Sequence, residues 1–78
     1  MPTVLLIEGY RFFFFSNEGQ EPPHVHVRRA GGVAKIWLQP VQVAYSLGLN
    51  PAELRRIREL TAEQQATFLE RWNEHLNR

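Results

Sequence analysis

A strict alternation of polar and apolar residues runs from His24 to Arg28. Pro22 and Pro23 precede this run and keep the backbone extended, because proline fixes its own φ and disfavours the helical region at the residue before it. Successive side chains of a strand point to opposite faces, so the two histidines and Arg28 share one face and the two valines share the other. The pattern predicts a strand that buries its valines and presents a polar row.

Two more strands are expected nearer the N-terminus. Thr3–Ile7 is apolar and Tyr10–Ser16 is aromatic, and both are rich in residues that favour strands. A two-residue turn at Glu8 and Gly9 would join them as a hairpin. That turn pairs Leu5 with Phe12 and Leu6 with Arg11.

Four consecutive phenylalanines, Phe12–Phe15, place phenyl rings on both faces of the second strand. A strand that is apolar on both faces is central, or is covered on its second face by helices or by a partner. A core that packs on both faces is favoured over a ligand site. Phe13 and Phe15 on the second face are nevertheless a candidate interface with another protein or a second copy of the chain.

The polar strand is expected to end in a hairpin at Gly31-Gly32, since glycine tolerates the positive φ of a tight turn. This register sets Arg28 opposite Lys35 and His26 opposite Trp37. One face of the hairpin is then an apolar core face, formed by Val25, Val27, Ala34, Ile36 and Leu38. The other face carries His24, His26, Arg28, Lys35 and Trp37.

Helices are expected in the second half of the chain. Pro40 can open a short helix over residues 40–47, with a strand through Val41 and Val43 as the alternative. Asn50-Pro51-Ala52-Glu53 is a strong helix start, because Asn can cap the helix and Glu can complete a capping box. A common helical phase favours one helix over residues 51–77, although Thr61-Ala62-Glu63-Gln64 resembles a second capping box and permits a break near residue 61.

At helical spacing, Leu54, Ile57, Phe68 and Trp72 face the sheet, and Leu60 falls off that stripe. Arg55 and Glu59 have the i, i+4 spacing of an exposed ion pair, which needs no functional explanation.

Strands followed by helices indicate an α+β fold. We expect a single domain over residues 1–78, in which a four-stranded antiparallel meander (1–38) is followed by a short helix and a long C-terminal helix packed on one sheet face. The chain has no cysteine and a net charge of +1, so disulfides are excluded and composition alone does not indicate a nucleic-acid binder. No signal peptide or membrane span is evident, and a cytoplasmic location is expected.

The predicted pairing of Arg28 with Lys35 is a stronger indication of function than the two histidines are, because like charges directly opposed on a sheet are destabilising. Either Glu18 or Glu21 from the preceding loop compensates them, or an anion such as phosphate does so. Together with His26 and Trp37 they form the parts of an RNA-binding sheet face. The same parts occur in metal-independent ribonucleases, but no catalytic motif supports that step here.

His24 and His26, at i and i+2 on a strand, could also converge on one metal ion. Two histidines fall short of a full ligand set, and a structural role is favoured. In that role His24 bonds to the loop and His26 packs on Trp37. We therefore expect no bound metal and no cofactor.

Several blocks of sequence resemble those of a small bacterial family filed as domain of unknown function 4160. They are Pro2–Leu5, Gly9–Phe12, Ser16–Glu18, Glu21–Val27, Ala34–Leu38 and Glu53–Ile57. The resemblance covers nearly the whole chain, and Glu-Pro-Pro-His-Val-His is its most specific part. It implies no established activity. It does imply a gene arrangement that looks like a toxin–antitoxin pair, and hence a protein partner and an RNA target.

The leading expectation is therefore a component of a toxin–antitoxin-like module that acts on RNA or on a cognate small protein through the basic and aromatic face. The first alternative is a non-enzymatic interaction module, as a homo-oligomer or with another protein. The second alternative is a small metal-binding domain built on His24 and His26.

Overall fold

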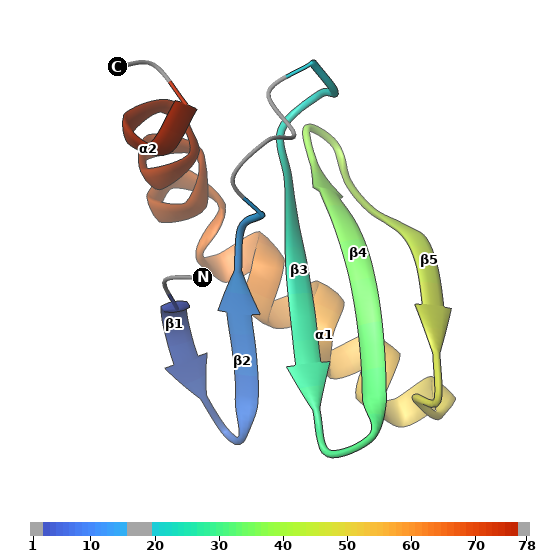
Figure 1. The fold of residues 1–78 in the computed structure, drawn as a ribbon. Coiled ribbons are helices and arrows are strands. Elements are labelled where there is room, and N and C mark those ends of the chain that lie inside the picture. Colours follow the sequence, from blue (N-terminus) through green and yellow to red (C-terminus); the bar gives the residue numbers. More distant parts are fainter. Residues whose placement is uncertain (1–2, 16–19, 77–78) are drawn as a thin grey trace.

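The computed structural model describes residues 3–15 and 20–76 (Figure 1). Five strands form one antiparallel sheet in chain order, and two helices follow them. The elements are β1 (Thr3–Ile7), β2 (Tyr10–Phe13), β3 (His24–Arg29), β4 (Gly32–Leu38), β5 (Val41–Leu47), α1 (Pro51–Glu63) and α2 (Gln65–Leu76). The α+β class is confirmed, and the sheet has one strand more than the sequence predicted.

The first hairpin follows the predicted register. Glu8 and Gly9 take positive φ values of 55° and 82°, and Leu5 pairs with Phe12 as expected. Arg56 of α1 donates hydrogen bonds of 2.9 and 2.5 Å to the Glu8 carboxylate, and Arg29 donates one of 2.7 Å to the Glu8 carbonyl. The turn is thus attached both to α1 and to the end of β3.

The second hairpin has the predicted faces but a different register. Arg29 pairs with Gly32, so Ala30 and Gly31 make the turn, with Ala30 at φ 51°. A Cβ on Gly32 would lie 2.6 Å from Leu49 Cδ2 and 2.7 Å from the Gly48 carbonyl oxygen. Gly32 is therefore needed for a close approach between chain segments, and the turn falls one residue earlier.

This shift moves every pair by two positions. His24 lies opposite Trp37 and His26 opposite Lys35, so the predicted pairs Arg28–Lys35 and His26–Trp37 are wrong. A shift of two residues keeps each side chain on its face. The core face of the hairpin is accordingly as predicted, with Val25, Val27, Ala34, Ile36 and Leu38 at most 1% exposed.

The predicted short helix over 40–47 is wrong, because the alternative strand forms there as β5. Apolar residues at positions 41, 43, 45 and 47 also fit a strand, and pairing with β4 decides the outcome. The register passes from Ile36–Val43 to Lys35–Tyr45, which leaves Ala44 as an extra residue in a β-bulge. Val43 therefore lies on the helix side of the sheet and Tyr45 on the opposite side.

The continuous helix is wrong and the alternative with a break is close to the structure, since α1 ends at Glu63 and α2 begins at Gln65. The capping box at Asn50 and Glu53 is present, with hydrogen bonds of 2.8 and 2.9 Å. The second capping box is not, because the Thr61 hydroxyl donates to the Ile57 carbonyl, 2.7 Å away, and lies inside α1.

One apolar core lies between the sheet and the helices. Of the predicted inward residues, Ile57 and Phe68 are fully buried, Trp72 is 6% exposed and Leu54 is partly buried. Leu60 is fully buried as well, contrary to its predicted position. The prediction used one helical phase for both helices, whereas within α1 alone Leu60 follows Ile57 by three residues and lies on the same side. Phe68 packs on Phe12 of β2, with ring centroids 5.1 Å apart.

Replacing Trp72 with alanine should strongly destabilise the fold. The Trp72 ring lies edge-on to Phe14 at 5.5 Å and 4.8 Å from the ring of His24, so the truncation leaves a cavity. We expect the free energy of unfolding to fall by ~3–5 kcal/mol in chemical denaturation. The exposed neighbour Arg71 provides the control. Equal midpoints for W72A and R71A would contradict this packing.

The two hairpin glycines should respond oppositely to alanine. Gly31→Ala meets no atom within 4 Å, whereas Gly32→Ala brings a Cβ against Leu49 and the Gly48 backbone. We expect a thermal midpoint near that of the wild type for G31A and a clear decrease for G32A, because backbone atoms cannot give way cheaply. A lower thermal midpoint for G31A than for G32A would contradict the close approach of Gly32 to Gly48 and Leu49.

The Glu8–Arg56 pair should make stability depend on acid pH. Hydrogen bonds from Arg56 chiefly lower the pKa of the Glu8 carboxyl below its ordinary value of 4.5, and the charges of Arg56 and Arg29 add to this. A carboxyl whose pKa is lowered in the folded state stabilises the fold at pH values above its pKa in the unfolded state. This contribution is lost as the pH falls through the pKa of the folded state. We expect the wild type to be more stable than Glu8→Gln at neutral pH, with the difference vanishing in acid. A constant difference between the two proteins would mean that the pair contributes nothing through charge.

Candidate functional site on the open face of the sheet

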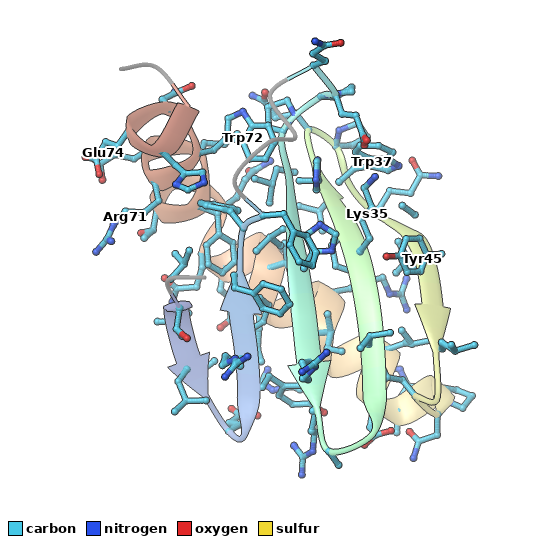
Figure 2. The ribbon with its side chains drawn as sticks, in the orientation of Figure 1. Lys35, Trp37, Tyr45, Arg71, Trp72 and Glu74 are labelled. Atoms are coloured by element: carbon cyan, nitrogen blue, oxygen red, sulfur yellow. The ribbon has the colours of Figure 1, made fainter. Side chains whose placement is uncertain are left out.

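The face of the sheet opposite the helices is called the open face here. It carries residues of alternate parity from each strand: Leu6, Arg11, Phe13, His24, His26, Arg28, Val33, Lys35, Trp37, Gln42, Tyr45 and Leu47. Phe15, just after β2, packs on this face against His26. Figure 2 shows Lys35, Trp37 and Tyr45 together on the neighbouring strands β4 and β5. The side chains of all five residues of the predicted binding face leave their strands on the open face. They differ in burial and in the residues that they contact.

His24 and His26 are components of a buried aromatic cluster. His24 is fully buried, its Nδ1 lies 2.9 Å from the Pro22 carbonyl oxygen, and its ring lies 5.6 Å from that of Trp37. His26 is 6% exposed, and its ring lies 4.4 Å from Phe15 and 5.7 Å from Phe13. The predicted bond from His24 to the loop is confirmed, but the histidine that packs on Trp37 is His24.

Lys35 is neutralised within the chain. Its ammonium pairs with the carboxylate of Glu21 and lies 4.7 Å from the centre of the Trp37 ring. A loop glutamate was one of the two compensations expected for this lysine, and Glu21 provides it. The other loop glutamate, Glu18, lies outside the described residues.

Arg28 has a different cationic neighbour from the one predicted. Arg11 of β2 is its direct Cα partner, and both arginines are exposed. Within residues 3–15 and 20–76, neither guanidinium has a carboxylate at ion-pair distance. Arg11 instead lies 5.6 Å from the centre of the Phe13 ring. The open face therefore contains two opposed positive charges whose mutual repulsion is not offset by a described acidic group.

Sequence reasoning missed Arg11 because no tight turn joins β2 to β3, so their register was unknown. The available signal was local: Arg11 alternates with Phe12, a core residue, and must therefore lie on the open face. Tyr45, which is 53% exposed, was missed because β5 was predicted as a helix.

The family model described as "Domain of unknown function (DUF4160)" matches residues 9–73. The chain belongs to this family. The match spans β2 to most of α2 and includes every charged residue of the open face. No curated protein matches the chain, and no solved structure does.

The phenylalanines proposed as an interface occupy different environments in this DUF4160 protein. Phe13 is 7% exposed, and its ring is edge-on to that of Phe15 at 5.4 Å. Phe15 remains 37% exposed. Two further apolar side chains on the open face, Leu6 and Leu47, are 67% and 72% exposed at its opposite margins.

The described part of the DUF4160 chain contains no group of three metal-ligating side chains. His75, the third histidine, contacts Phe14 at 5.7 Å, and its buried Nε2 has no hydrogen-bond partner among the described residues. Neither helix is long and apolar enough to cross a membrane. What the open face offers chemically is anion binding by two arginines, with exposed aromatic rings elsewhere on the same face.

Proposed function

We propose that this protein binds single-stranded RNA on the open face of its sheet, as a component of a toxin–antitoxin-like module. The observation that carries the proposal is the direct opposition of Arg11 and Arg28, both exposed and without a described acidic partner. Such a pair costs stability in the free protein and gains it when an anion bridges the two guanidinium groups.

Aromatic residues elsewhere on the open face supply the contacts to bases that a phosphate site alone lacks. Phe15 and Tyr45 are exposed, and Trp37 is half-buried, so their rings are available for contact with unpaired bases. Bases of single-stranded RNA stack on such rings with little dependence on sequence. The arginines lie on one part of the sheet and the aromatic rings on another. A flexible single strand can reach both and has unpaired bases for stacking, so it is favoured over a rigid duplex.

The burial of the histidines argues against extending the proposal to a ribonuclease. A general base must approach the proton that it removes, and His24 and His26 have at most 6% of their surface exposed. The proposed role is therefore binding, and the toxin–antitoxin setting is supported only by the resemblance of the sequence to its family.

A protein-interaction role is a second candidate, because Leu6, Phe15 and Leu47 leave large apolar side chains exposed on the open face. A homo-oligomer formed through this face would cover them. It would also cover Arg11 and Arg28, so RNA binding and self-association would compete.

Filter binding of short RNAs across a salt series tests the RNA proposal. Arg11→Ala and Arg28→Ala should each weaken binding and reduce the salt slope by roughly 0.7, the value for one phosphate contact with a single strand. Lys35→Ala should change the slope less, because Glu21 already neutralises this lysine. Trp37→Ala should lose ~1–3 kcal/mol of binding energy with little change in slope.

Arg71 of α2 is the matched control, since it is exposed and projects away from the sheet (Figure 2). Arg71→Ala removes the same charge from another surface and should leave both affinity and slope unchanged. No binding by the wild type at low salt, or an equal loss in R71A and R28A, would refute the proposal. Sedimentation of the same samples would report any self-association.

A further inference from the structure

The sheet has a free edge at β5, on the opposite side from β1. β5 pairs with β4 and with no other described strand, and Figure 1 shows it at the side of the molecule remote from both termini. An edge strand presents unpaired backbone N–H and C=O groups, which a strand from another chain can pair with. This edge does not belong to the Arg11–Arg28 site.

A groove of about 460 Å³ lies beside that edge, between β5 and α1. Its lining is Val41, Gln42, Val43, Pro51, Leu54 and Arg58. A second hollow of about 400 Å³ shares Val41 and Arg58 with it and is also lined by Arg55, Glu59 and Ala62 of α1. The groove is mainly apolar, and it adjoins the Val41–Val43 half of β5, before the bulge at Ala44.

Cations border the groove along α1. Arg55 and Arg58 are exposed, and neither has a carboxylate partner among residues 3–15 and 20–76. The predicted Arg55–Glu59 pair does not form, because Glu59 pairs with Arg56 at 3.1 Å. The groove therefore combines an apolar floor and a free strand edge with two available positive charges.

We infer that this edge binds an extended, acidic segment of a protein partner, which adds to the sheet as a sixth strand beside Val41–Val43. Apolar side chains on one face of that segment would occupy the groove. Its carboxylates would pair with Arg58 and Arg55, whose charge they complement. Backbone pairing would supply affinity, and the alternation of apolar and acidic residues would supply specificity.

A second copy of this chain fits the edge less well. The bulge at Ala44 interrupts β5, and bulges are one of the devices that oppose edge-to-edge pairing of identical strands. A symmetric dimer through β5 would also bring two copies of the same cationic margin together, and like charges across an interface are unfavourable.

Synthetic peptides test the inference directly. The probe is a capped peptide of about ten residues in which valine and glutamate alternate, which is long enough to span the edge. One control peptide has lysine in place of every glutamate, and a second has a central proline, which cannot donate a backbone hydrogen bond. Binding is measured by titration, and the site is mapped by amide chemical shifts of the labelled protein.

We expect the valine–glutamate peptide to bind and to shift amides of Val41–Val43 and of the α1 residues around Arg58. Arg58→Glu should weaken its binding roughly fivefold, the upper range for one exposed ion pair, and Arg55→Glu should act in the same direction. Arg71→Glu makes the same charge change on α2 and should have no effect. Arg11→Ala should also leave peptide binding unchanged, which separates this test from the RNA proposal.

Three results would overturn the inference. The first is equal binding of the lysine peptide or of the proline peptide, which would exclude recognition by charge or by strand pairing. The second is a set of shifted amides on the open face, around Lys35 and Tyr45, with none at Val41–Val43. The third is an equal loss of affinity in R58E and R71E, since that would make the effect one of net charge.

Discussion

The covering of one face of the sheet by the helices is the constraint on which the rest of this structure depends. Phe12, Val27 and Ile36 are fully buried on the face that the helices cover. Because side chains alternate along a strand, each of these residues sends its neighbours to the opposite face. Arg11, Arg28 and Lys35 are therefore on the open face as a geometric consequence of the core, and no separate device is needed to gather them there.

The same alternation explains how much of the fold could be predicted. The faces of the β3–β4 hairpin were predicted correctly although its register was not, since a slip of two residues conserves side-chain direction. Gly32 determined that slip through its approach to Gly48 and Leu49, a contact between segments that no local pattern encodes. β5 was mispredicted because tertiary pairing overrides local periodicity, and Leu60 because one helical phase was applied across the break between α1 and α2.

Some features of the candidate site follow from the local sequence, and others depend on contacts between distant segments. A polar row on β3 was foreseeable, but its burial was not, because Trp72 of α2 and Phe15 are what cover the two histidines. The compensation of Lys35 by Glu21 was foreseeable from the nearby loop. The opposition of Arg11 and Arg28 was not, since it depends on the register between two strands that a longer connection joins.

The bulge at Ala44 determines which side chains of β5 reach each surface. Before it, Val41 and Val43 pair with Leu38 and Ile36 on the helix side, and after it Tyr45 lies beside Lys35 on the open side. Loss of the single codon for Ala44 would make Val43 and Tyr45 consecutive residues of a regular strand, so each would keep its present face. A regular strand that kept Ala44 and paired it with Lys35 would instead turn Tyr45 toward the core. Position 44 is therefore a place where β5 can lose three nucleotides and keep both of its surfaces.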